Sequence, residues 1–157
     1  MATIVTPYLT KLDSIEKELP NVARQAVIDN SSEIVLLIKS QLSHGLNSFG
    51  NPLSWSGGTG FYAKSTQSFA YRDNVFIPKD KGSPYNFSWS GETLDNLQMG
   101  SVTGSEFDVT TVAYKKKLLE GIYGEIFDLT EEHNQYVNIE IILPSLIDYI
   151  LKTLVVI

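Results

Sequence analysis

Residues 21–46 read NVARQAVIDNSSEIVLLIKSQLSHGL, and this stretch predicts the helix on which the rest of the fold is built. Its apolar side chains return every three or four positions, the spacing that places them on one face of an α-helix. Gly45 and Gly50 are expected to break the helix, because glycine is a helix-ending residue. The expected buried face consists of Ala23, Val27, Ile34, Ile38 and Leu42.

Three further apolar residues of this stretch, Val35, Leu36 and Leu37, fall partly off that face. One apolar stripe is enough to bury the helix in its own domain, so the surplus side is predicted to meet a partner. A shorter helix is expected before it, over about residues 7–19. Pro20 would end that helix and begin the long one, because proline is tolerated in the first turn of a helix.

The bulk composition indicates one globular domain over residues 1–157, with 43% hydrophobic and 19% charged residues. The absence of cysteine excludes disulfides and thiolate metal sites. A net charge of −6 argues against a protein that binds nucleic acid by neutralising phosphates. The N-terminus lacks the pattern of a signal peptide, and charged residues and a proline interrupt the apolar C-terminus. We therefore expect a protein made in a reducing cytoplasm, with no membrane partner.

The stretch 46–90 holds most of the aromatic residues and shows no sustained periodicity. Long loops of this kind in compact domains are usually functional or disordered. Such aromatic content needs something to pack on, so our hypothesis is that the loop becomes ordered on assembly. Together with Val35, Leu36 and Leu37, the residues predicted to contact neighbouring subunits or partners are Phe49, Trp55, Phe61, Tyr62, Phe69, Tyr71 and Trp89.

The remainder of the chain predicts a small sheet followed by helix. Residues 97–114 alternate in polarity and read as two strands joined near residues 103–105. Residues 115–129 are a candidate helix. Thr130 is a favourable N-cap for a final helix, which Pro144 is expected to kink or divide. These elements predict an α+β fold: a long N-terminal helix, an irregular aromatic loop, a small antiparallel sheet and a C-terminal helix. One face of the second strand should carry Phe107, Val109 and Thr111.

Charge is unevenly distributed along the C-terminal half. Lys115, Lys116 and Lys117 follow one another, whereas residues 118–151 contain seven carboxylates and neither lysine nor arginine. Each run is explained by a solvated face. The alternative is that positive and negative surfaces meet between neighbouring copies in an assembly. The lysines could touch an acidic neighbour or DNA, and the sequence leaves both open.

A catalytic site is not indicated. The phrases SWSGGT (54–59) and SWSGET (88–93) lack the spacing of a phosphate-binding loop, and neither Ser56 nor Ser90 has the flanking glycines of a nucleophile elbow. The two histidines, His44 and His133, lie in helix-end contexts and flank no nucleophile. No cluster has the spacing of metal ligands. Both phrases are interpreted as turns that tryptophan anchors, and no catalytic, cofactor or metal residue is predicted.

Several motifs in order resemble one known family. They are EIVLLIKSQLSHGLNSFGNPLS (33–54), FSWSGETLDNLQM (87–99) and IYGEIFDLTEEHNQYVNIEIILPSLIDYI (122–150). Together they resemble the virion-morphogenesis proteins of tailed phages, of the tail-completion or head–tail-joining type. The likeness covers roughly residues 25–150 and depends on turn and cap residues in a shared order. Ser90 departs from the family pattern, and the loop is unusually aromatic.

The resemblance implies a structural protein without an active site or cofactor. Six or twelve copies would form a ring in the neck of the virion, between the portal or adaptor and the tail proteins. Packaged DNA would pass through an acidic lumen without specific binding, because like charges repel. Assembly would take place in the bacterial cytoplasm. The alternatives are a tail terminator or tail-tube protein and, more distantly, a small hydrolase or a ligand-binding module.

Overall fold

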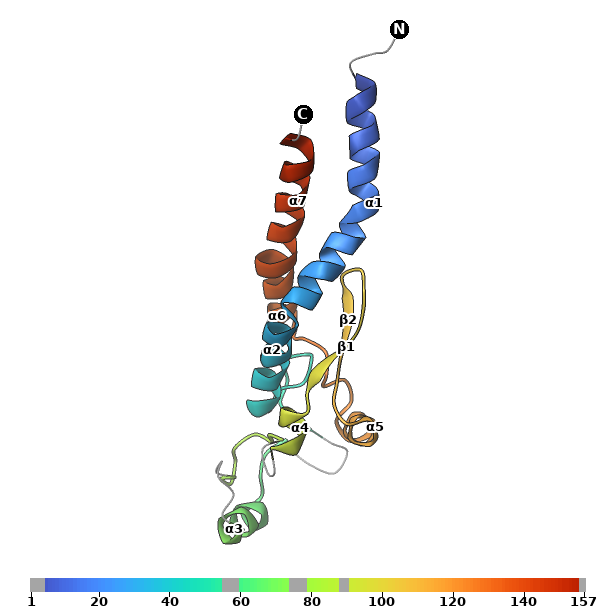
Figure 1. Ribbon diagram of the computed structural model, residues 1–157. Coiled ribbons are helices and arrows are strands. Elements are labelled where there is room, and N and C mark those ends of the chain that lie inside the picture. The colour runs from blue at the N-terminus through green and yellow to red at the C-terminus, as the bar shows by residue number, and fades with distance from the viewer. Residues whose placement is uncertain (1–4, 55–59, 74–78, 88–90, 156–157) are drawn as a thin grey trace.

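The computed structural model describes residues 5–54, 60–73, 79–87 and 91–155. It confirms the α+β fold: a long N-terminal helix, a two-stranded antiparallel sheet and a C-terminal helix. Figure 1 shows that α1 and α7 run side by side as a two-helix stalk, while the hairpin and the short helices lie at its base. The elements are α1 (Val5–Asp29), α2 (Ser31–Ser43), α3 (Lys64–Arg72), α4 (Glu92–Asp95), β1 (Gln98–Thr103), β2 (Glu106–Thr110), α5 (Ala113–Tyr123), α6 (Glu131–Tyr136), the π-helical segment η1 (Val137–Ile142) and α7 (Leu143–Val155).

The first helix does not end at Pro20, so the predicted boundary between residues 19 and 21 is wrong. Helix α1 continues through Pro20 to Asp29. Proline removes one backbone hydrogen bond, but the buried residues Ile15 and Val27 on either side hold the helix against the rest of the chain. Figure 1 shows α1 changing direction partway along its length, as an internal proline commonly causes.

The helix breaks ten residues later instead, at Asn30, so the expected single helix over residues 21–46 is two helices. The Asn30 side chain donates to the Ala26 carbonyl at 2.8 Å, and the Asn30 carbonyl accepts from the Glu33 N–H at 3.0 Å. Asparagine and serine side chains compete with the helix for backbone groups, which explains why the sequence Asn30–Ser31–Ser32 allows a break. Helix α2 then begins at Ser31.

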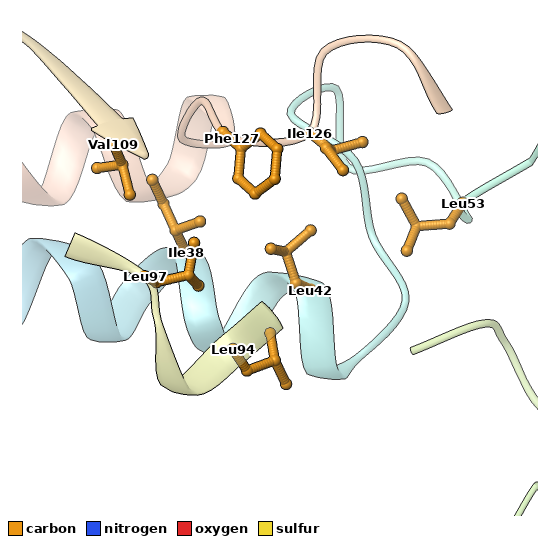
Figure 2. Packing of buried hydrophobic residues seen from close by; sticks show 8 residues of the cluster. All are labelled: Ile38, Leu42, Leu53, Leu94, Leu97, Val109, Ile126 and Phe127. Carbon is orange, nitrogen blue, oxygen red and sulfur yellow. The ribbon is translucent and has the colours of Figure 1, made fainter. Parts of the chain in front are cut away.

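The predicted apolar face is confirmed, because all five of its residues are buried. They divide between two clusters. Ile38 and Leu42 pack with residues from β2, from the segment that runs from α4 into β1, and from the loops before α3 and after α5 (Figure 2). Ala23, Val27 and Ile34 pack against η1. Full burial of one such aliphatic side chain contributes about 1.5–3 kcal/mol. The cluster in Figure 2 comprises Ile38, Leu42, Leu53, Leu94, Leu97, Val109, Ile126 and Phe127.

The hairpin has the predicted position and turn. Thr103 pairs with Glu106, and Gly104 has φ of +61°, a conformation that glycine adopts readily. The ladder contains an irregularity between Met99 and Val102. Of the face predicted for the second strand, Val109 and Thr111 are buried and Phe107 is partly buried against both clusters.

The C-terminal third begins with α5, which ends at Tyr123 rather than near residue 129. Gly124 follows with φ of +76°. Thr130 caps α6 as predicted, since its Oγ1 accepts from the His133 N–H at 3.3 Å. The expected disturbance before Pro144 takes the form of a wide turn, η1, in which the Leu143 N–H donates to the Asn138 carbonyl.

The aromatic stretch is more regular than its lack of periodicity suggested. It contains helix α3, and two isolated bridges, Leu46 with Pro52 and Phe61 with Pro84, connect its remaining described parts. Tyr62 is buried there, and its ring packs edge-on against Tyr85 with centroids 5.1 Å apart. Helix α3 spans only nine residues, which is too short for its apolar spacing to stand out in the sequence.

Candidate subunit interface

The residues predicted to contact partners do not all lie on the surface. Leu36 on α2 is exposed, whereas its neighbours Val35 and Leu37 are partly buried and pack against the two core clusters. Tyr62 is buried in the chain's own loop. Phe49, Phe61, Phe69 and Tyr71 are exposed, and Trp55 and Trp89 lie outside the described residues.

Tyr62 belongs to a polar and aromatic cluster that joins the two described parts of the loop on either side of residues 74–78. Its hydroxyl donates to the Asn86 carbonyl at 2.9 Å and accepts from the Asn86 N–H at 3.0 Å. The Lys79 ammonium lies 5.4 Å from the Tyr62 ring centroid and donates to the Asn86 side chain. Burial raises the pKa of Tyr62 and lowers the pKa of Lys79 to about 8. These contacts give Tyr62 a role in folding the loop.

Two of the three consecutive lysines are engaged within the chain. Lys115 pairs with Glu92, and this hydrogen bond raises the lysine pKa. Lys116 pairs with Asp108 at 2.7 Å and also donates to the Val109 carbonyl. Lys117 is exposed and forms no ion pair with the described residues. Of the predicted charged contacts, Lys117 is therefore the one that remains available to a partner.

Neither histidine ring is hydrogen-bonded to a serine or threonine hydroxyl among the described residues. His44 Nδ1 lies 2.7 Å from the Ser40 carbonyl at the end of α2. His133 lies in the first turn of α6, and its Nδ1 has no hydrogen-bond partner among the described residues. Ser56 and Ser90 fall outside the residues that the structure describes. Within the described ranges, no three His, Cys, Asp or Glu side chains are arranged to hold a metal ion.

Two open grooves follow strand β1. One, of about 480 Å³, lies between α2 and the segment from α4 into β1; the other lies between α1 and β1. Ser31 and Met99 line both grooves. In the groove between α1 and β1, Arg24 Nε donates to the Val102 carbonyl at 3.2 Å. This backbone carbonyl on β1 therefore already has a hydrogen-bond partner. The residues that line the grooves bring no histidine together with a nucleophile.

The most regular apolar surface lies on α5 and on the C-terminal helices, and the sequence reasoning missed it. On α5, Tyr114, Leu118 and Ile122 are spaced four residues apart and are between 40% and 66% exposed. We call them the α5 ridge. A second row continues with the same spacing from η1 through α7, with exposures between 46% and 76%. We call it the α7 ridge; it comprises Ile139, Leu143, Ile147, Leu151 and Val155.

The spacing itself was readable in the sequence. Residues four apart form the ridges that pack into grooves of a neighbouring helix. Their exposure was not readable, because a buried face and an exposed one can have the same period.

Among the described helices, none is both long enough and apolar enough to cross a bilayer.

Comparison of the chain with protein-family models, with curated proteins and with solved structures found no significant match.

Proposed function

We propose that the protein is a structural component of the virion of a tailed bacteriophage. Copies would form a ring in the neck that joins the DNA-filled head, on the portal side, to the tail. The order of motifs along residues 25–150 motivates this assignment. The observation that carries it furthest is the amount of apolar surface that the isolated chain leaves in water.

Seventeen large apolar side chains among the described residues are exposed. Single exposed apolar residues are ordinary, but contiguous rows on a soluble protein usually mark an interaction surface. Eight of the seventeen belong to the α5 and α7 ridges. A subunit that is stable only when surrounded by copies and neighbours is expected to have such a surface.

The charge of the chain is compatible with DNA passage. With a net charge of −6, a ring of copies would repel the phosphate backbone and so avoid retaining it. Packaged DNA would then slide through the lumen without specific contacts. The partners of the ring would be the portal or adaptor on one side and tail proteins on the other, with assembly in the host cytoplasm.

The test is a nonsense codon early in this gene in its native virus, with negative-stain microscopy of the lysate. The proposal predicts filled or leaking heads beside unattached or missing tails. Tails of irregular length on joined particles would instead indicate a tail terminator. Particles of normal appearance and normal infectivity would refute the proposal.

A further inference from the structure

We infer that the α5 ridge of one copy packs against the α7 ridge of the next, so that the subunits join head to tail. The inference rests on the proposed ring and names the surfaces that build it. It depends on three observations: the matched spacing of the two ridges, the charges left over beside them, and their separate places in the fold.

The two ridges match in geometry. Both repeat every four residues, and rows of this spacing on two helices interdigitate in the commonest class of helix packing. Gly121 lies on the exposed side of α5, beside Ile122, and a Cβ placed there would meet nothing within 4 Å. This small residue leaves a notch in α5 into which a leucine or isoleucine of the α7 ridge can insert.

The charges beside the ridges are complementary. Lys117 lies next to Leu118 and forms no ion pair with the described residues, because the neighbouring Lys115 and Lys116 take the local carboxylates. Glu140 lies next to Ile139, is exposed and likewise forms no ion pair with the described residues. Asp148, the other acid along the α7 ridge, already pairs with Lys152 at 2.6 Å. The cation without an ion pair among the described residues is therefore Lys117 on α5, and the corresponding anion is Glu140 on η1.

The position of the ridges makes the contact head to tail. Figure 1 places α5 at the base of the molecule beside the hairpin and α7 in the stalk, so one copy cannot join its own two ridges. When α5 of one copy covers α7 of a second, each copy still presents one free ridge. Contacts of this heterologous kind propagate and close into a ring when the rotation between copies permits it.

The experiment uses the purified full chain in sedimentation velocity over a concentration series. Wild type is expected to show a weight-average mass that rises with concentration. Leu118→Glu and Ile147→Glu should each stay at the mass of one chain, because each places a charge in one ridge. Leu9→Glu, which makes the same leucine-to-glutamate change at a residue of α1 that is 55% exposed and lies outside both ridges, is the matched control and should associate like wild type. Circular dichroism and thermal unfolding establish that each variant is folded.

Mixing the two defective variants tests the head-to-tail arrangement. Leu118→Glu retains its α7 ridge and Ile147→Glu retains its α5 ridge, so an equal mixture should reach twice the mass of one chain and no more. If like ridges paired with like, Leu118→Glu alone would dimerise and the mixture would add nothing; that result would overturn the inference.

Charge exchange tests the register. Lys117→Glu and Glu140→Lys should each reduce association at low salt, and the double variant should restore it. Wild-type association that none of the ridge variants changes would overturn this contact and leave the ring to other surfaces. A wild-type chain that stays monomeric up to its solubility limit would also overturn the contact, whereas the nonsense-codon experiment decides the function separately.

Discussion

Gln41 is the buried polar residue on which the junction between the two halves of the chain depends. Its side chain is 1% exposed. Its Nε2 donates to the Asp128 carbonyl at 3.0 Å, and its Oε1 accepts from the Thr130 N–H at 3.1 Å. One side chain on α2 thus satisfies two backbone groups immediately before α6. Replacing it with leucine keeps the approximate volume but leaves both groups without their partner.

The expected cost follows from those two groups. Both hydrogen bonds are partly buried, and such a bond contributes about 0.5–1.5 kcal/mol, so Gln41→Leu should lower the free energy of unfolding by about 1–3 kcal/mol. For a domain of this size that corresponds to a fall in Tm of roughly 2–12 °C. Gln41→Glu should also be destabilising at neutral pH, because it removes the donor to Asp128 while retaining the acceptor for Thr130.

Urea unfolding followed by circular dichroism measures the effect, with Gln135→Leu as the control. Gln135 is exposed and its side chain donates only within α6, to Glu131 at 3.0 Å, so its replacement should change stability by less than about 0.5 kcal/mol. If Gln41→Leu were as stable as this control, the bridge between α2 and the start of α6 would not contribute as argued.

Three further predictions concern single residues. Because burial lowers the pKa of Lys79 from 10.5 to about 8, the unfolded chain binds more protons between those values, so stability should rise with pH there. Urea unfolding should show the free energy of unfolding of wild type rising by about 2 kcal/mol relative to Lys79→Met between about pH 7.5 and about pH 9.5. If the two proteins showed parallel pH profiles of stability, the burial effect would be contradicted. Thr130→Ala should cost about 1 kcal/mol through loss of the α6 cap, whereas Thr130→Ser should retain most of it, as measured by urea midpoints. Gly45→Ala should destabilise the protein by about 2–4 kcal/mol, because Gly45 has a φ of +75° and an added Cβ would collide with the Tyr85 carbonyl. A Tm close to that of wild type in thermal unfolding would count against this close contact between residues 45 and 85.

The features that the sequence predicted correctly are those that depend on short spacing. The buried face from Ala23 to Leu42, the hairpin turn near Gly104 and the Thr130 cap each involve residues within a few positions of one another or a repeat of 3.6 or 2. Pro20 shows where local reasoning failed. Its intrinsic preference favours a boundary, but burial of Ile15 and Val27 on either side outweighs one lost hydrogen bond.

The candidate site illustrates the same division. The spacing that makes helical faces apolar, including the rows on α5 and α7, is present in the sequence, because periodicity is local. Tertiary packing covers the face of Ile38 and leaves the face of Ile147 in water. It also pairs Lys115 and Lys116 but gives Lys117 no ion pair with the described residues. The physical reason is that covering a face or pairing a charge requires a second element distant in the chain, and packing selects that element.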